Sequence, residues 1–519
     1  MNSHFLNVVK ENYKFYGGIS FLYGLFFLFC IEEGFSGITF PICVIGTLVV
    51  YVLFFQKAGI TIKKKSWKYL AGMALLGFAN CYTSNWIFIF LDVIAILLLF
   101  ILFVIQQFYD DKRWDTWLYI QNMCMSIGAF LSKAFSPFTD GMKIMKTSHK
   151  TDEKKKHAVK GIVIGFMISL LLLLFILPLL LSSDLVFSEL FNRVFQIPDF
   201  QLWNFETAIE RIILFLVGVM CCYGFFKGMC VSHLKTEQRE FKKTESIVGI
   251  TINTVMVVLY VVYCFIQILY LFIGFGKGLP DGVTYAEYAR TGFFELLFVS
   301  CINFLLVAIS NAVFAENKIL KILLFIISGC TFIMIGSSGY RMILYIRQYH
   351  LTFLRVFVLW FLGVMVLLMS GLIISMKKKD FSLFRYIVVV MMCCYIPFVY
   401  SRPDAWIAKY NLSQENVTWE DISYFIYNGS YDCIPAITEI DVMEVKNSQK
   451  EADYMYHDEV YQIESVEDEI VYQMEEFLKG DQNQYTEAGD MDMKQWNYSE
   501  YQARKAAREY LDQIYENSK

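Results

Sequence analysis

The sequence is poor in charge and lacks the residue patterns that mark common catalytic and metal sites. Only 18 % of the 519 residues are charged, 56 % are hydrophobic, and the mean hydropathy is +0.46. We find no CxxC, HExxH, GxSxG, GxxxxGK[ST] or EF-hand spacing, and the six histidines are scattered. These absences argue against an ordinary soluble enzyme of this length, and they give no reason to expect a cofactor or a bound metal.

The apolar residues fall in runs of about 15 to 25, the length of a helix that crosses a hydrocarbon core roughly 30 Å thick. The pattern predicts an all-α polytopic transmembrane helix bundle. We expect about eleven spans, at 17–31, 36–55, 68–82, 86–106, 160–182, 211–232, 247–274, 291–313, 319–337, 353–375 and 382–400. Residues 114–159 predict an interfacial helix and a basic loop, with an additional short span as the alternative. We expect no signal peptide, because the first run ends at Glu32 and Glu33 without a cleavage site.

Charge divides the chain after residue 400. Residues 401–519 contain 26 acidic and 10 basic side chains, a net charge of −16, so residues 1–400 carry +12 of the chain's total of −4. Lysine-rich loops alternate with acidic or neutral ones, which predicts a multi-pass protein of the cell membrane with a cytoplasmic N-terminus and an extracytoplasmic tail. A basic bundle faces anionic lipid, so membrane lipid and not nucleic acid is the expected partner.

The tail, residues 401–519, predicts a small, mostly helical soluble domain with acidic linkers. Pro403 and Asp404 suit the first turn of a helix, and Thr418 to Asp421 have the spacing of a capping box. An amphipathic helix that Gly480 ends is predicted by spacings of three and four between Ile463, Val466, Ile470, Met474 and Phe477. The apolar content supports only a small core. With Cys433 as its one cysteine, the tail has no internal disulfide.

Polar residues within or beside the predicted spans form our candidate intramembrane polar cluster. An ionisable side chain in a membrane is a functional candidate by default, although a structural salt bridge or interhelical hydrogen bond needs the same residues. The cluster comprises Asp92, Gln267, Tyr288, Arg290, Glu295, Asn303, Arg341, Tyr345 and Arg355.

Within this cluster, Glu295 is expected to pair with Arg341 or Arg355, or else to face water. The spacing of Arg341, Tyr345 and Arg355 predicts that they share one face of a helix. Lys227, near the end of a span, is expected to snorkel to the membrane surface.

Several ordered stretches resemble a known family. They are FIQILYLF (265–272), TYAEYARTGFFEL (284–296), YRMILYI…YHLTFLRV…W (340–360), RPDAWIAKYNL (402–412) and SYDCIPAI (430–437). Together they are similar to a bacterial multi-spanning family known as domain of unknown function 4173, a near relative of 4153, over roughly residues 184–435. The resemblance implies a polytopic membrane protein and supplies no activity, so it assigns no catalytic residue.

These observations favour an integral membrane protein of the cell envelope that is not an enzyme and whose helical tail binds or modulates a protein partner. The alternative is a transporter or lipid-handling protein that uses a polar path with Asp92, Glu295 and Arg341. Against it, the sequence shows no clear internal repeat and no pair of Gly/Pro-broken spans. A membrane-embedded enzyme would need a nucleophile with a base, or paired acids, at one depth. The nearest approach is Tyr340, Tyr345 and His350.

Overall fold

The structure, a computed structural model, describes residues 2–112, 114–148, 205–232, 234–235, 243–269, 293–378, 380–414, 417–440, 452–456, 459–463, 466–479 and 494–517. Within these ranges the regular structure is helical apart from one antiparallel hairpin, β1 (Ala452–Tyr456) and β2 (Glu459–Ile463). The predicted all-α fold class is therefore confirmed.

Nine helices in the described ranges are long and apolar enough to cross a membrane. They are α2 (Tyr13–Ile31), α3 (Thr39–Lys57), α5 (Trp86–Phe108), the segment Ile209–Val231, α12 (Ser246–Gln267), α14 (Phe293–Val313), the segment Lys318–Arg347 of α15 (Lys318–Tyr349), α16 (Phe353–Lys377) and α17 (Leu383–Tyr400). The segment Ile209–Val231 comprises most of α10 (Phe205–Val219), the π-helical turn η2 (Met220–Gly224) and α11 (Phe225–Val231). Each of the nine coincides with a predicted span, whereas the span predicted at 160–182 lies outside the described residues.

The third predicted span is a short helix. α4 (Trp67–Ala79) follows the 3-10 turn η1 (Lys64–Ser66) and has only 13 residues. That is about 20 Å of helix, about 10 Å less than the hydrocarbon core. The polar loop Asn80–Asn85 then leads into α5.

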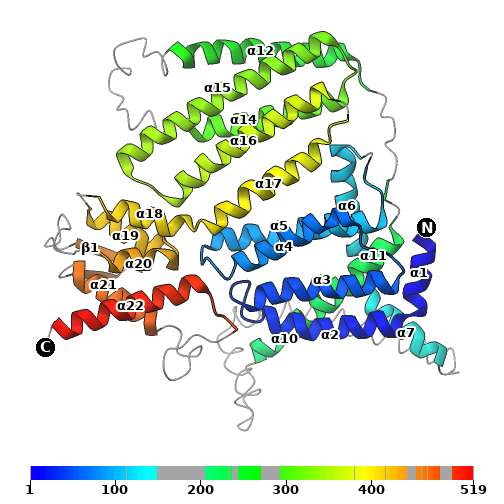
Figure 1. The fold of residues 1–519 in the computed structure, drawn as a ribbon, viewed down its shortest axis with the longest axis horizontal. Helices are drawn as coiled ribbons and strands as arrows, with labels where there is room; N and C mark the ends of the chain where they lie inside the picture. The colour runs from blue at the N-terminus through cyan, green and yellow to red at the C-terminus, as the bar shows by residue number, and fades with distance from the viewer. Residues whose placement is uncertain are drawn as a thin grey trace, which may run out of the picture.

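The first group of membrane helices packs around an aromatic core. It contains α1 (Asn2–Glu11), α2, α3, α4, α5, α10 and α11, in the lower half of Figure 1. Phe226 lies at its centre, with ring centroids 5.5 Å from Tyr16, 6.1 Å from Tyr51, 5.0 Å from Phe54 and 5.7 Å from Phe55. Aromatic pairs at these separations contribute about 0.5–1.5 kcal/mol each beyond their burial, so this core is a main source of stability.

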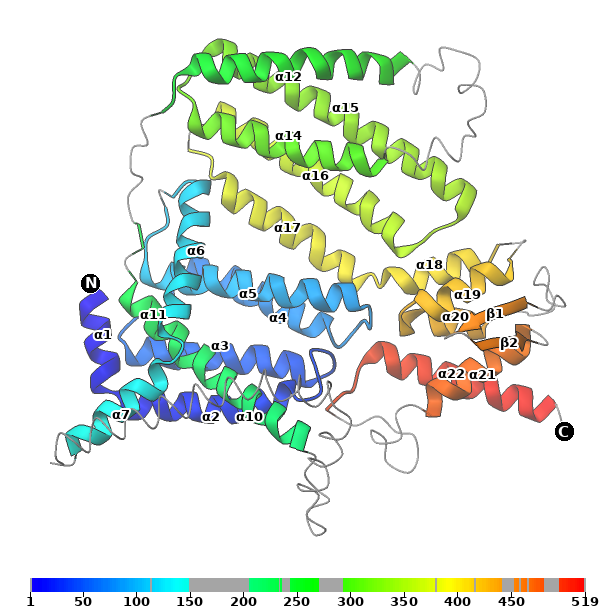
Figure 2. The same cartoon turned by 180° about the vertical axis from the view of Figure 1, so that it is seen from behind.

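A second group, α12, α14, α15 and α16, has its own core, and α17 joins the two groups. Figures 1 and 2 both show α17 between them. Val390 of α17 belongs to the second core, while Tyr395 and Val399 belong to the first. The last span therefore holds the two halves of the bundle together.

Two further helices follow α5. α6 (Thr116–Lys133) runs across the ends of α4 and α5 in both views, and α7 (Ser136–Ser148) comes next. α6 buries Leu118, Tyr119 and Asn122 and exposes Trp117 and Leu131, so it is amphipathic. It is not among the nine candidate spans, and its interfacial location stays a prediction.

The C-terminal domain lies at the end of the bundle opposite the N-terminus (Figures 1 and 2). Its helices are α18 (Pro403–Leu412), α19 (Trp419–Asn428), η4 (Tyr431–Cys433), α20 (Ile434–Thr438), α21 (Val466–Lys479) and α22 (Tyr498–Asn517). They share a third core that includes Ile407, Ile422 and Ile470. The capping box of Thr418 and Asp421 is confirmed. The amphipathic helix begins at Val466, later than predicted, because Ile463 belongs to β2 and pairs with β1.

Candidate functional site

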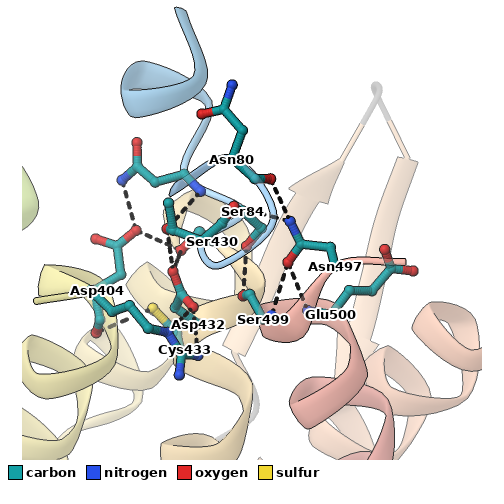
Figure 3. Close-up of polar contacts among 12 residues, drawn as sticks. Asn80, Ser84, Asp404, Ser430, Asp432, Cys433, Asn497, Ser499 and Glu500 are labelled. Atoms are coloured by element: carbon teal, nitrogen blue, oxygen red, sulfur yellow. Dashed lines mark hydrogen bonds and ion pairs between the residues drawn. The ribbon is translucent and has the colours of Figure 1, made fainter. Parts of the chain in front are cut away.

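The loop Asn80–Asn85 is covered by the C-terminal domain. Ser66, just before α4, donates to Gln106 Oε1 near the end of α5 (2.7 Å), so these two helix ends lie level. Because α4 and α5 are level at this end, the missing length of α4 falls at its C-terminal end, where the loop Asn80–Asn85 lies. Figure 3 shows this loop against side chains of α18, η4 and the start of α22. We define the docking cluster as Thr83, Asn85, Arg402, Asp404, Ser430 and Asp432.

Asp432, in η4, is at the centre of the docking cluster. Its Oδ1 accepts a hydrogen bond from Arg402 Nε (2.8 Å) and lies 2.6 Å from Arg402 Nη2. Its Oδ2 accepts from the Thr83 hydroxyl of the membrane loop (2.6 Å). The side chain of Asp432 is 1 % exposed, and Thr83 is fully buried. Since a buried carboxylate is stable only when it is paired and hydrogen-bonded, these contacts fix η4 against the loop.

Arg402 marks a sharp turn between the last span and the C-terminal domain. Its backbone is left-handed, with φ +48° and ψ +67°. This conformation costs a non-glycine residue about 1–3 kcal/mol and persists only where the surroundings determine it. The guanidinium lies 5.3 Å from the ring centroid of Tyr82 and 5.1 Å from that of Tyr498, and the two rings stack at 5.0 Å. Arg402 therefore connects α17, the membrane loop and α22.

Asp404 is a second buried carboxylate in the docking cluster. Its Oδ2 accepts from Asn85 Nδ2 (2.8 Å) and from the Ser430 hydroxyl (2.6 Å). Burial raises the pKa of Asp404; the hydrogen bonds from Ser430 and Asn85 oppose the rise, and the charge of Asp432 adds to it. Asn85 Oδ1 also accepts from the amide of Ile87 (2.9 Å), so one side chain caps α5 and holds the C-terminal domain.

The docking segment, Lys494–Ser499, fastens the last helix to the same loop. Asn497 Nδ2 donates to the carbonyls of Asn80 (3.0 Å) and Thr83 (3.2 Å), while its Oδ1 accepts from the Ser499 amide (2.8 Å) and caps α22. The amide of Tyr498 donates to the Cys81 carbonyl (2.7 Å). Backbone polar groups of the loop therefore find their partners in the C-terminal domain.

The docking segment also contacts the loop between α2 and α3. Gln495 donates to Glu33 (2.8 Å), and Lys494 Nζ lies 4.8 Å from the ring centroid of Phe29, inside the first span. Gly37 has φ +85°, and a Cβ there would lie 2.9 Å from the backbone of Gln495. Glycine is therefore required at this contact.

The polar side chains of the docking cluster are hydrogen-bonded to one another. Its two carboxylates accept hydrogen bonds from Thr83, Asn85, Arg402 and Ser430. In the part of the chain that the structure describes, no group of three or more His, Cys, Asp and Glu side chains could hold a metal ion. The geometry suits a fixed joint between two domains.

The candidate intramembrane polar cluster divides into separate contacts. Gln267 Oε1 accepts from Ser337 (2.7 Å) and from Arg341 Nη2 (3.3 Å), which links α12 to α15. Asn303 donates to Thr331 Oγ1 (3.0 Å) and links α14 to α15. Both contacts lie within the second helix group, where interhelical hydrogen bonds take the place of a hydrophobic driving force.

The shared helix face predicted for Arg341, Tyr345 and Arg355 is wrong. α15 ends at Tyr349 and α16 begins at Phe353, because His350 adopts a positive φ of 60° and the chain reverses. Arg355 instead donates to the carbonyls of Tyr349 and His350, and its guanidinium lies 4.3 Å from the Tyr345 ring centroid. It stabilises the turn between the two helices.

The predicted pairing of Glu295 with an arginine is not observed. Glu295 is exposed, and no salt bridge joins it to Arg341 or Arg355 among the described residues. Glu295 lies in the first turn of α14, and the alternative expectation, that it faces water, stays a prediction. Tyr288 and Arg290 lie outside the described residues.

Asp92 lies in different surroundings, where α5 meets α17. Its side chain is fully buried, and neither carboxylate oxygen makes a hydrogen bond of ordinary geometry within the described chain. The Tyr395 hydroxyl lies beside it. The structure therefore separates Asp92 from both Arg341 and Glu295.

The expectation that Lys227 snorkels is wrong. Its ammonium forms a salt bridge with Asp140 of α7, and both side chains are at most 8 % exposed. Asp140 also accepts from the Tyr223 hydroxyl (3.0 Å) and lies 3.5 Å from Lys143 Nζ. Burial acts to raise the pKa of Asp140, but the contacts with Lys227, Tyr223 and Lys143 together leave the pKa below its ordinary value.

A further buried carboxylate, Asp111, lies just after α5 and is not among the residues predicted from the sequence. Its Oδ2 accepts from the Tyr119 hydroxyl (2.6 Å) and from Gln106 (2.8 Å), and Oδ1 lies 3.2 Å from Arg385 of α17. Burial acts to raise the pKa of Asp111, but the hydrogen bonds and the charge of Arg385 lower it overall. This network joins α5, α6 and α17 at the end of the bundle away from the C-terminal domain.

The fold and the docking cluster define a multi-pass membrane protein with a C-terminal domain docked on its bundle. The chain belongs to the family described as Domain of unknown function (DUF4153), which matches residues 70–440. This family is the near relative of the one that the sequence resembled, and the match does not extend to 4173 itself. It covers the docking cluster but stops before the docking segment. No curated protein and no solved structure matches the chain.

Proposed function

We propose that the protein is a membrane-anchored binding protein without enzymatic activity. The helix bundle holds the C-terminal domain in a fixed orientation, in which the domain binds or modulates a protein partner. The observation that carries the proposal is the attachment of this domain at both ends, through Arg402 and Asp432 at its beginning and through Asn497 at its last helix. A buried salt bridge is weak evidence for stability alone, and in some proteins it fixes one arrangement of the chain, which is the role proposed here. A simple tether would not need it.

The surface of α21 suits a basic partner. Asp468, Tyr472 and Glu476 are exposed and recur every four residues, so they form one stripe along the helix. An aromatic side chain between two carboxylates offers contact area and charge complementarity to lysine- or arginine-bearing surfaces. The net charge of −16 over residues 401–519 would also attract a basic partner at long range.

The proposal places the C-terminal domain outside the cytoplasm, with the N-terminus inside. Paired topology reporters, one active only in the cytoplasm and one only outside it, are fused after Lys519 and inserted in the loop 277–290. Both positions should report outside, since the lysine-rich loops belong in the cytoplasm. A cytoplasmic signal after Lys519 alone would make the number of spans wrong by an odd number and would move the search for partners to the cytoplasm.

Site-specific photocrosslinking in cells tests the binding function. A photoreactive amino acid replaces Tyr472, and the matched control replaces Val258, a 61 % exposed residue on the candidate membrane span α12. We expect a discrete protein adduct from position 472 and none from position 258. The adduct should weaken in Asp432→Ala, which releases the domain from its fixed orientation. Two further probes replace Tyr501 and Asp512, which are exposed on α22. The absence of an adduct from all three positions of the C-terminal domain would contradict the proposal.

The alternative, a transporter with a polar path through Asp92, Glu295 and Arg341, draws support from one observation: Asp92 is buried without a hydrogen bond of ordinary geometry in the described chain. The three residues share no contact, which argues against a continuous path in this conformation. Glu295→Gln distinguishes the two functions. It should abolish flux in a transporter and leave the photocrosslinked adduct unchanged in a binding protein.

A further inference from the structure

Positive charges gather at the end of the bundle away from the C-terminal domain, where α4 begins and α5 ends. Lys63 Nζ donates to the carbonyls of Gln106 (2.6 Å) and Tyr109 (2.8 Å), at the end of α5. Because α5 is long enough to cross the membrane, its end lies at the membrane surface. The residues that follow Lys63 therefore also lie at that surface.

Two cations from different helices lie close together there. Gly72 of α4 packs against Met392 of α17, and the Tyr400 hydroxyl at the end of α17 donates to the Leu75 carbonyl near the end of α4 (2.8 Å). The two helices therefore run side by side in the same direction, and their first turns bring Lys68 and Arg385 to the same end, where the two positive charges repel.

Arg385 is held by Asp111 (3.2 Å). Lys64 and Lys65 are exposed just before Lys68, and the acids near this group are Asp110 and Asp111, so the cations outnumber the acids. Like charges held together at a surface favour the binding of an anion between them.

Exposed apolar residues follow the two cations along the same helices, toward the interior of the membrane. Leu75 lies two turns after Lys68 on the same face of α4 and is 46 % exposed. Val389 lies about one turn after Arg385 on α17 and is 42 % exposed. Trp67, 63 % exposed, is at the level that tryptophan favours in membrane proteins. Charge at the surface with apolar residues beneath it matches the layout of a phospholipid.

We propose that α4 and α17 together bind an anionic phospholipid, with Lys68 and Arg385 contacting its headgroup phosphate. The acyl chains lie along Leu75 and Val389, and Trp67 packs at the headgroup level. The bound phosphate relieves the repulsion between the two cations. Free phosphate offers the same charge but leaves the apolar surface unused, so the site favours the lipid. This inference does not depend on the function of the C-terminal domain.

Fluorescence quenching in reconstituted vesicles tests the site with the full chain. The vesicles contain phosphatidylcholine, and either phosphatidylglycerol or additional phosphatidylcholine carries brominated acyl chains that quench tryptophan. The difference between the wild type and Trp67→Phe isolates the Trp67 signal. We expect brominated phosphatidylglycerol to quench Trp67 in preference to brominated phosphatidylcholine. Lys68→Gln should reduce that preference about fivefold, since one cation near the surface contributes on this scale.

Three comparisons make the result decisive. Lys68→Arg keeps the charge and should keep the preference, even if Lys68→Gln also lowers stability. Lys321→Gln removes a lysine from α15 that is 3.5 Å from Glu316, and it should leave the preference unchanged. Equal quenching by both lipids, or equal effects of Lys68→Gln and Lys321→Gln, would overturn the proposal. So would loss of the preference in inorganic phosphate but not in chloride of equal ionic strength, because the site would then serve free phosphate.

Discussion

Replacement of Asp432 by alanine should release the C-terminal domain from the bundle. The change removes the acceptor for Arg402 and for the Thr83 hydroxyl, the contacts that connect η4 to the last span and to the membrane loop. Arg402 then keeps its buried charge and its left-handed backbone without the partner that holds them. Undocking lets the guanidinium reach water, so the variant favours the undocked state.

The magnitude follows from the burial of this pair. Loss of one partner of a buried salt bridge costs about 3–5 kcal/mol, and the side chains of Asp432 and Arg402 are 1 % and 15 % exposed. Since each 1.4 kcal/mol is a factor of ten, the undocked population should rise about 100- to 4,000-fold. The bundle itself should stay folded, because its aromatic core does not involve Asp432.

Alkylation of buried cysteines measures the undocking. Cys81 lies in the covered loop, 8 % exposed, with its thiol donating to the Gly37 carbonyl (2.9 Å). Cys433, 1 % exposed, reports from the other side of the interface. A maleimide should label both much faster in Asp432→Ala, read peptide by peptide in a mass spectrometer and normalised to the denatured chain.

Two variants control the experiment. Asp512→Ala removes an exposed carboxylate of α22 and should label at the wild-type rate. Asp432→Ala combined with Arg402→Ala should label more slowly than Asp432→Ala alone, because it leaves no unpaired charge at the interface. If Cys81 reacts no faster in Asp432→Ala than in Asp512→Ala, the docking cluster does not hold the domain and the reasoning is refuted.

Three further predictions concern other buried charged residues. Because the pKa of Asp404 is raised in the docked state, the protein takes up a proton when the domain docks. The docked state should therefore be most stable below the ordinary carboxyl pKa, and its stability should fall as the pH rises through the raised pKa. Thermal unfolding of the C-terminal domain from acidic to neutral pH should show this trend, and Asp404→Asn should remove it. Asp92→Leu should stabilise the bundle by about 1–3 kcal/mol in thermal unfolding, whereas Asp111→Leu, which breaks a satisfied network, should destabilise it. Lys227→Met should cost about 3–5 kcal/mol, and the addition of Asp140→Leu should restore most of the loss.

The membrane bundle was predictable because its signal is local. Each span is a continuous apolar run, so its position follows from length and hydropathy alone, and nine runs match helices of the described chain. α4 is short because Lys63 to Lys65 precede it and the polar loop follows it. The apolar run alone predicted a span at 68–82, three residues beyond the end of the helix.

The docking cluster was not predictable, because its contacts join distant parts of the chain. Thr83 and Asp432 are 349 positions apart, and Asn85 and Asp404 are 319 apart. In the sequence, Asp404 appears only as a favourable residue for a first helical turn. The sequence around Asp404 does not predict that its carboxylate is buried against the loop Asn80–Asn85.

The two wrong predictions, for Lys227 and for the helix face of Arg341 and Arg355, have the same cause. Lys227 lies near the end of an apolar run, where snorkelling is the usual explanation, and its partner Asp140 is 87 positions away in a less apolar segment. The helix face drawn through Arg341 and Arg355 failed at His350, whose positive φ no local rule for histidine predicts. Periodicity locates a face only as long as the helix continues.

The docking segment has a consequence for the order in which the protein is completed. Gln495 meets Glu33 across 462 positions, and Ser499 meets Ser84 across 415. During synthesis, the loop that receives the segment is made more than 400 residues before it, so the carbonyls of Asn80 and Thr83 lack their Asn497 partner throughout that interval. A chain that ends between residues 440 and 494 would contain every predicted span but would lack the docking segment, a form that quality control could distinguish from the docked chain.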